Sequence, residues 1–395
     1  MMTTETFFAS RNFLTPAFRI ELGGSDTGRE VISDVLEVSF TDDLENIDSF
    51  EFNLHDWDPI RLLPKYSSPW DESGTPLKLS EGGPDVPNFE PGAKVSLFMG
   101  YLEDGDLPLI MEGEVVSLAP TFPASGSPTC KVRALNVFLR GLQKIRVEGN
   151  YSGTAKEIVD TLCQENGVSV EWATLDTEGA SEEKVEVEGI LYDEIASRAQ
   201  EYGLTIGTIP AEQPGTDPKL HLSLPSDGGD EAVADFIWGR TLISFAPALS
   251  AAGQVSKVIA RGGDATQDGG AQNIEVSKTW SDIGLSPSAL GPSGSADIET
   301  AVGGITEVIK PDNIASEEDA ENAALARLRE LAATLITGSG SSIGLPTLRA
   351  GKLVTMAGMG ARFDGTYRLT QTTHAIGGSG YATNFQARKE VLENG

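Results

Sequence analysis

Histidine and cysteine supply much of the nucleophilic, acid–base and metal chemistry of proteins, and this 395-residue sequence has only three histidines and two cysteines. His55, His221 and His374 lie far apart, and none belongs to an H-E-x-x-H or H-x-E pattern. Cys130 and Cys163 lie in apolar segments without C-x-x-C spacing, which favours small buried residues over a disulfide or a metal pair. We therefore expect no metal site, and we interpret His374, which follows a strand pattern, as a hydrogen-bonded structural residue.

Acidic residues are numerous enough to resemble a glycosidase pair at many places. Groups such as Glu103, Asp104 and Asp106 are interpreted as a solvated face, because nothing in the sequence buries one carboxyl and separates its pKa from its neighbour's. The Gly262–Asp264 and Gly303–Gly304 segments lack the lysine and the strand–turn–helix setting of a phosphate loop, and no G-x-S-x-G pattern is present. The sequence predicts no catalytic residue and no cofactor.

Composition and charge exclude further classes of function. Lys and Arg number 29 against 59 Asp and Glu, for a net charge of −30, so a basic surface that neutralises nucleic-acid phosphates is excluded. No apolar stretch approaches the roughly 18 residues of a membrane span. The first 18 residues lack the basic and apolar regions of a signal peptide, so we expect synthesis in the cytoplasm.

The elements that would position any site are mostly strands. Alternating apolar residues predict an antiparallel β domain over residues 1–148, including a strand that spans Val31 to Phe40. Prolines and glycines in residues 66–88 predict a loop excursion from that sheet, because proline lacks the donor that a central strand needs.

The centre of the chain, residues 149–235, predicts small α/β insertion domains. Thr154 and Glu157 fit a capping box that opens one helix, and a second apolar helical face ends near Gly203. Residues 236–395 return to β character and predict a second β-barrel domain, with a long loop at 267–304 and a helix at 316–336. The predicted fold class is mainly β, with two similar tubular β-barrel domains flanking a central α+β region.

The two β regions share a spaced pattern. Gly92-Ala-Lys-Val95-Ser-Leu97 leads to Glu112-Gly113, and Gly351-Lys-Leu-Val354-Thr-Met356 leads to Asp364-Gly365. Each reads as a strand, a glycine-rich turn, an acidic-Gly bulge or turn, and a strand, and hairpins of different length absorb the unequal spacing. This pattern favours a duplicated β module over chance recurrence.

These motifs resemble the baseplate hub of the phage late control D and VgrG type. The resemblance rests on residues 16–20, 89–95, 100–101 and 112–116 near the start, on 154–167 and 190–203 in the middle, and on 345–351, 362–367, His374 and 380–385 near the end. By resemblance, the structural motif residues are Gly92, Val95, Gly100, Tyr101, Gly113, Gly351, Asp364, Gly365, Tyr367, His374 and Tyr381.

The resemblance implies a homotrimer in which each chain contributes two similar barrels, so that three chains present six modules around a channel and join a hexameric tail tube to a trimeric spike. It implies a structural protein of the virion tail baseplate, or of a phage-like injection particle, rather than an enzyme. The implied partners are the tail tube protein, a central spike protein and neighbouring baseplate proteins, without stable nucleic-acid or membrane binding, although DNA passes through such channels.

Some features depart from the resemblance or leave alternatives. VgrG-type chains continue into a spike, whereas this sequence ends at Gly395, so we expect the spike to be a separate polypeptide. Residues 66–88 and 267–304 are longer than the family needs, and we expect them to dock neighbouring proteins. The acidic excess fits either a channel wall that repels DNA or a salt-adapted surface. The alternative functions are a tail-associated peptidoglycan hydrolase with an Asp/Glu pair, and a LysM-like cell-wall-binding unit at Thr154–Trp172.

Overall fold

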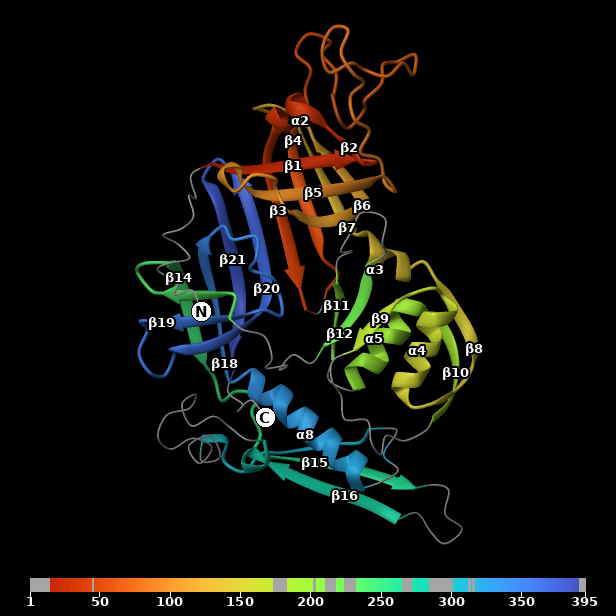
Figure 1. Cartoon of the computed structure of the whole chain (residues 1–395), viewed down its shortest axis with the longest axis vertical. Helices are drawn as coiled ribbons and strands as arrows, with labels where there is room; N and C mark the ends of the chain where they lie inside the picture. The colour runs from red at the N-terminus through yellow and green to blue at the C-terminus, as the bar shows by residue number, and fades with distance from the viewer. Residues whose placement is uncertain are drawn as a thin grey trace.

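The computed structural model describes residues 15–44, 46–172, 183–201, 204–209, 218–223, 232–264, 272–283, 301–311, 314 and 317–390. The fold is mainly β, as predicted, and its centre is one 13-stranded sheet that takes strands from both ends of the chain. Figure 1 shows this sheet running from the N-terminal strands to the C-terminal strands, with a helical unit beside it and a helix-covered sheet below it.

The N-terminal part of the sheet, which we call module A, has a core of alternating apolar residues that includes Phe40, Phe52 and Leu97. Its elements are β1 (Pro16–Leu22), β2 (Ser25–Asp26), α2 (Gly28–Asp34), β3 (Val35–Asp43), β4 (Ser49–His55), β5 (Lys94–Tyr101), η1 (Leu102–Asp104), β6 (Leu109–Thr121) and β7 (Thr129–Asn136). The expectation of a strand from Val31 is wrong, because residues 28–34 form the short helix α2, in which Val31 is the buried residue that packs against the core.

The excursion at residues 66–88 has only isolated bridges, and it covers the core of module A. The buried carboxylate of Asp56 anchors its start by accepting hydrogen bonds from the backbone N–H groups of Lys65, Tyr66 and Ser67 at 2.9, 2.6 and 3.1 Å. Tyr66, Leu77 and Val86 are buried along it.

The central unit has its own apolar core. Its elements are α3 (Val137–Leu142), β8 (Arg146–Gly153), α4 (Ala155–Glu165), β9 (Val170–Trp172), β10 (Glu183–Ile190), α5 (Leu191–Glu201), β11 (Thr205–Ile209) and β12 (Lys219–Ser223). The predicted capping box is present, since the Thr154 hydroxyl accepts from Glu157 N and the Glu157 carboxylate accepts from Thr154 N. The expected helix end at Gly203 lies outside the described residues.

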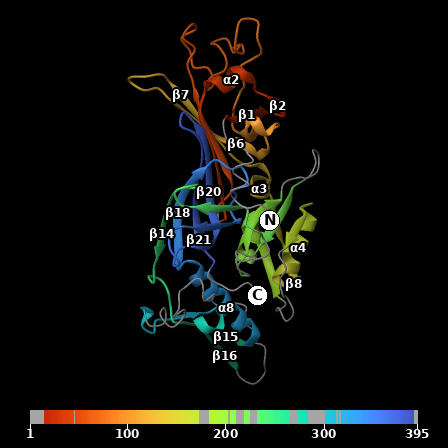
Figure 2. The ribbon, with the colours of Figure 1, turned by 60° about the vertical axis from the view of Figure 1, so that its left-hand side comes forward.

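The C-terminal part of the sheet, module B, comprises β13 (Ala234–Ile237), β14 (Leu242–Leu249), β18 (Ile336–Ile343), β19 (Leu353–Ala357), β20 (Gly365–Gly377) and β21 (Gly380–Lys389). Inserted between β14 and β18 is a separate three-stranded sheet of β15 (Lys257–Asp264), β16 (Gln272–Thr279) and β17 (Thr306–Ile309), with η2 (Trp280–Asp282) and α8 (Glu317–Ala333). Figure 2 shows α8 beside β15 and β16.

The prediction of one long loop at 267–304 is therefore wrong in part, because β16 and η2 lie inside it. The polar residues of β16 did not look like a strand, but its backbone pairs along its whole length with β15, and Trp280 just after it is fully buried. Residues 265–271 and 284–300 of that segment lie outside the described residues. The predicted helix at 316–336 is present as α8, whose Ala320, Ala324 and Leu328 are buried.

Candidate assembly surface

Modules A and B have the same strand order. Read across the sheet, module A runs β1-β5-β6-β7-β4-β3 and module B runs β13-β19-β20-β21-β18-β14, so each strand of A has a counterpart in B at the same rank along the chain. Every corresponding pair is antiparallel in both modules except the first, since β1 pairs antiparallel with β5 whereas β13 pairs parallel with β19. Apart from the direction of this first strand, the chain folds one topology twice.

Two register shifts of the modules coincide as well. The β3–β4 pairing shifts between Val35 and Glu37, and the corresponding β14–β18 pairing shifts between Leu242 and Ser244. The β6–β7 and β20–β21 pairings also shift at one equivalent position each, at Val115/Ser117 and Leu369/Gln371. β-Bulges re-aim strands and are specific features of a fold, so their coincidence gives a residue-by-residue correspondence between modules.

The glycines of the predicted pattern support this correspondence. Gly92 and Gly351 both have positive φ, of 96° and 84°. Gly92 N donates to Val115 O at 2.8 Å, and Gly351 N donates to Leu369 O at 2.8 Å, at the equivalent bulge. Val95 and Val354 occupy equivalent positions on β5 and β19, because they face Gly113 and Tyr367 respectively.

The second half of the predicted pattern is out of register by two residues. Gly113 corresponds to Tyr367, and Gly365 corresponds to Met111. The two positions are filled differently: a Cβ on Gly113 would lie 2.9 Å from the Phe50 ring. In module B the sizes are reversed. The counterpart of Gly113 is Tyr367, which is fully buried, and the counterpart of Phe50 is Gly338. Large and small residues have exchanged places between two similar cores.

The modules join through β20 and β3. Residues Gln371–Ile376 of β20 pair antiparallel with Val38–Asp43 of β3, which makes the two module sheets continuous. On the exposed face of this junction, Gln371 Nε2 donates to Asp43 Oδ2 at 2.6 Å, and the hydroxyls of Thr41 and Thr373 are 3.2 Å apart.

A buried polar cluster lies beneath the same junction. His374 Nε2 is 2.7 Å from the carbonyl oxygen of Leu348, and Nδ1 is 2.9 Å from Tyr381 Oη and 3.2 Å from Thr383 Oγ1. Burial lowers the pKa of His374 to about 4, so the ring is neutral at pH 7, donating to Leu348 and accepting from a hydroxyl. From module A, Tyr101 Oη donates to Gly344 O at 3.0 Å, and its ring lies 5.6 Å from that of Tyr381.

An ion pair lies next to this cluster. Arg349 Nε donates to Asp42 Oδ2, and Ala350 N donates to the same oxygen at 3.1 Å. Burial, with the nearby Asp42 carboxylate, raises the pKa of Asp48 well above its usual range. Sequence reasoning missed Asp42, Asp48 and Arg349, because the two aspartates lie in a segment that looks like a turn and Arg349 has no acidic neighbour in the sequence.

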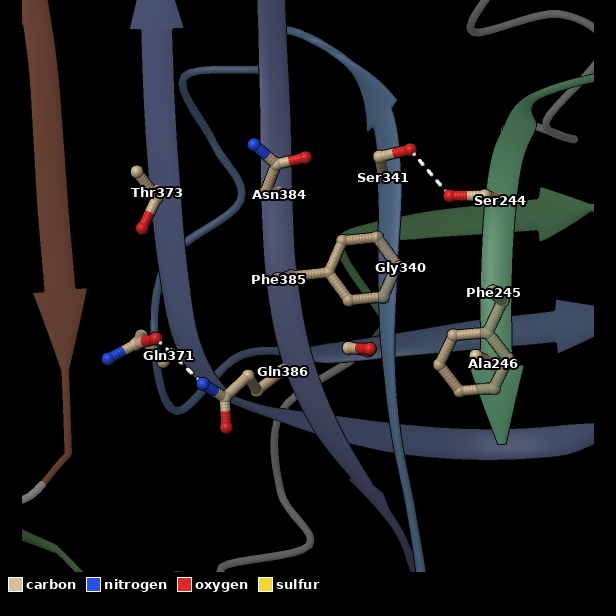
Figure 3. Close-up of a pocket in the computed structure, with 11 residues that line it drawn as sticks. Ser244, Phe245, Ala246, Gly340, Ser341, Gln371, Thr373, Asn384, Phe385 and Gln386 are labelled. Carbon is tan, nitrogen blue, oxygen red and sulfur yellow. Dashed lines mark hydrogen bonds between the residues drawn. The ribbon is translucent and has the colours of Figure 1, made fainter. Parts of the chain in front are cut away.

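The exposed face of module B carries polar side chains together with the rings of Phe245 and Phe385 (Figure 3). It forms an open cavity of about 440 Å³ lined by, among others, Ser244, Ser341, Gln371, Asn384 and Gln386. The hydroxyls of Ser244 and Ser341 are 2.7 Å apart, and Gln386 Nε2 donates to Gln371 Oε1 at 2.9 Å. Side chains of this kind can line a wetted surface, and they contain no nucleophile–base pair.

The predicted motif residues fall into three places. Tyr101, His374 and Tyr381 come together at the junction. Equivalent positions in the two modules hold Gly92 and Gly351 next to the bulge, and Val95 and Val354 on the strand. Gly113 is the counterpart of Tyr367. The remaining residues support local turns and close packing: Gly100 lies against Pro108, Asp364 Oδ1 accepts from Met359 N at 2.7 Å, and Gly365 has a φ of 136° beside Lys389.

Other predicted features can be placed as well. Cys130 and Cys163 are buried free thiols, as predicted, and burial raises the pKa of each to about 12. In the described ranges, no three His, Cys, Asp or Glu side chains gather as metal ligands would. Of the helices that the structure describes, none has the length and apolarity to cross a membrane.

A family model described as the Alg8 N-terminal domain matches residues 76–378, which is most of the chain, so the chain belongs to that family. No curated protein matches the sequence.

Solved structures resemble the chain over nearly its whole length. The 43 kDa tail protein of prophage MuSo2 from Shewanella oneidensis is 14% identical, with a TM-score of 0.65 over 95% of this chain and 98% of that one. A tail protein from Neisseria meningitidis is 12% identical, with a TM-score of 0.62 over 95% and 97%. An E. coli component of the type VI secretion system, described as similar to the phage T4 tail proteins gp27 and gp5, is 11% identical, with a TM-score of 0.51 over 94% and 76%. The chain has the fold of phage tail proteins.

Proposed function

We propose that this member of the Alg8 N-terminal domain family is a structural hub of a contractile phage tail baseplate or a phage-like injection particle. Three copies form a ring of six modules that encloses a channel and joins a hexameric tail tube to a trimeric central spike. The tube protein, a separate spike protein and neighbouring baseplate proteins are its partners.

The observation that carries this proposal is the repeated module with coincident bulges. A three-fold ring cannot present six equivalent contacts unless each chain supplies the contacting unit twice. Modules A and B meet that requirement, and the β20–β3 pairing sets them side by side in one chain. The fold shared with tail proteins supports the same assignment.

The same geometry supports a non-enzymatic role. Among the described residues, the carboxyl whose pKa is raised by burial is Asp48, and it lies beside Arg349 and Asp42 rather than in the open cavity. A general acid must reach its substrate, so this carboxyl does not suit a peptidoglycan hydrolase.

The excursion at residues 66–88 remains our proposed contact with a neighbouring protein, and its exposed Trp70 suits an interface anchor. Deleting the excursion would expose the core of module A to solvent. Substitutions of its exposed residues are therefore the appropriate test of this contact. The proposed docking role of 267–304 concerns residues that the structure describes only in part.

The proposal is tested by the mass and symmetry of the full chain. Multi-angle light scattering over a range of protein concentrations is expected to give three times the chain mass of 41.8 kDa. Electron-microscopy class averages are expected to show a three-fold ring with six similar lobes. A chain that stays monomeric at the highest concentration, or a ring of another symmetry, would contradict the hub, and a lytic band on a peptidoglycan zymogram would favour the hydrolase.

A further inference from the structure

Several strand edges of the large sheet lack a backbone partner in the described part of the chain, and two of them are related to the junction between the modules. One is the outer edge of β14, which is the last strand at the module B end of the sheet. The other is the edge of β6 beyond Val115, where β6 continues with β7 but no longer with β5. Figure 2 shows the β6–β7 hairpin projecting from the sheet.

These two edges are the counterparts of the two edges that join the modules inside the chain. By the bulge correspondence, β14 is equivalent to β3, and the far half of β6 is equivalent to the half of β20 that pairs with β3. Each chain therefore contains one completed junction and the two separate halves of a second one.

Burial follows the same division. Asp42 and Ile376, the counterparts of Leu249 and Phe122 in the completed junction, are 7% and 6% exposed. On the open edges, apolar side chains remain in solvent: Leu249 is 45% exposed and Phe122 is 59% exposed. Apolar residues are left exposed where the counterpart junction buries its residues, which marks an unfilled contact.

The register of the completed junction can be transferred to the open edges. It brings residues 117–122 opposite residues 250–245, and the segments then match in sequence: Ser-Leu-Ala-Pro-Thr-Phe faces Ser-Leu-Ala-Pro-Ala-Phe. The facing pairs are Ser117–Ser250, Leu118–Leu249, Ala119–Ala248, Pro120–Pro247, Thr121–Ala246 and Phe122–Phe245. Neither segment carries a charge, in a chain whose net charge is −30.

The prolines at the centre of both edges have a specific consequence. Ser250 N donates to Leu335 O at 3.0 Å, so the alternate residues Phe245, Pro247 and Leu249 direct their backbone away from β18 to the open edge. Pro120 corresponds to His374, whose backbone faces β3. A proline on each edge discourages nonspecific strand pairing in the free chain, because proline has no backbone N–H to donate. In the matched register Pro120 and Pro247 face each other, so both missing donors fall at the same residue pair. The hydrogen-bonded pairs on either side of it, Leu118–Leu249 and Phe122–Phe245, keep their donors.

We propose that β14 of one copy pairs antiparallel with the far half of β6 of the next copy, with Pro120 opposite Pro247. This pairing rests on the proposed ring of three chains and specifies how the ring closes: the seam between chains repeats the β3–β20 junction within the chain. The occupant of each open edge is thus a second copy of this chain.

Disulfide trapping tests the register in the full chain. Ala119 and Ala248 are both exposed and would face each other at a non-hydrogen-bonded pair, where Cα atoms are about 4.5 Å apart and a disulfide can form. In the Ala119→Cys/Ala248→Cys variant, mild oxidation is expected to give covalent trimers that reducing agent returns to monomers. The native Cys130 and Cys163 are buried, which keeps the background low.

The matched control is Ala119→Cys/Ala246→Cys, which moves one thiol by two residues on the same strand face and makes the pair diagonal, at about 7–8 Å. It is expected to give at most a tenth of the cross-linked product. Equal cross-linking in both variants, or a trimer by light scattering that the matched pair does not cross-link, overturns this seam but leaves the hub. A chain that neither cross-links nor associates overturns both.

A second pair of variants tests the seam without cysteines. Leu249→Glu places a charge opposite Leu118 and is expected to weaken trimer association at least tenfold. Ile243→Glu, on the same strand but at the bulge outside the six facing pairs, is expected to change it less than threefold. Since both residues are exposed, both variants should fold, which their thermal unfolding checks. Equal effects of the two substitutions would contradict the proposed contact.

Discussion

His374 is a buried imidazole that the fold holds in its neutral form. Its two ring nitrogens are engaged by the Leu348 carbonyl and by the hydroxyls of Tyr381 and Thr383, and burial lowers its pKa to about 4. Protonation would force Nδ1 to donate toward groups placed to donate to it, and it would add a positive charge near Arg349. The ring therefore couples the stability of the module junction to pH.

The direction of this coupling follows from the two pKa values. In the unfolded chain the imidazole takes a proton near pH 6.5, whereas in the fold it does so only near pH 4. As pH falls through this window the unfolded state binds more protons, so the free energy of unfolding decreases, by about 3 kcal/mol once both values are passed. The raised pKa of Asp48 acts in the opposite direction at low pH.

Substitution isolates the contribution of His374. We expect His374→Gln to cost about 1–2 kcal/mol at pH 7, because hydroxyl partners are left unsatisfied, and to reduce the loss of stability between pH 6.5 and 4. Denaturant unfolding at several pH values measures both effects. His55→Gln, at the end of β4, is the control and should retain the native pH dependence. A His374 variant with an unchanged pH slope would refute the role of this ring.

At the scale of elements, the bulge glycines provide the sharpest test that the two modules are equivalent. Gly92 and Gly351 have similar positive φ angles and make the same hydrogen bond, and a Cβ would meet no close contact at either. Replacing each with alanine should therefore carry the same cost, about 1–2 kcal/mol, which comes from the left-handed backbone alone.

Chemical denaturation of Gly92→Ala, Gly351→Ala and the Gly378→Ala control measures this equivalence. Gly378 has open space around its Cβ position and a φ outside the left-handed region, so alanine there should be close to neutral. Costs that differ by more than about 1 kcal/mol between the two bulge positions would indicate that the modules only look alike in topology.

The sequence predicted those elements that are determined by residues a few positions apart. The capping box at Thr154, the apolar stripe of α8 and the glycine–strand pattern around each of Val95 and Val354 all come from residues close in sequence. The β20–β3 junction joins residues more than 300 positions apart and has no sequence signature.

The equivalence of Gly113 with Tyr367, rather than with Gly365, depends on the position of a β-bulge, for which the sequence has no recognisable pattern. Strand β16 carries polar residues on an exposed face, at Glu275 and Ser277, which weakened its strand pattern. The partly buried ion pair of Arg349 with Asp42 could be found only after folding brought the two modules together.

For the whole molecule, charge and assembly act against each other. Each chain carries a net charge of −30, so bringing copies together in a ring concentrates like charges. The proposed seam contains no charged residue, and its attraction comes from apolar contact and backbone hydrogen bonds, neither of which salt screens. Ring formation should therefore be opposed by long-range repulsion and favoured by short-range contact.

This balance predicts that salt strengthens the trimer. The screening length falls from about 10 Å at 0.1 M to about 3 Å at 1 M salt, which removes most of the repulsion between exposed carboxylates and leaves the apolar seam intact. We expect the association measured by sedimentation equilibrium to increase at least tenfold between 0.05 and 1 M NaCl. Leu249→Glu should start weaker and shift in the same direction, because the repulsion is distributed over the surface. A trimer that dissociates as salt is added would instead be held by ion pairs between chains, a role that the uncharged edges of β6 and β14 cannot supply.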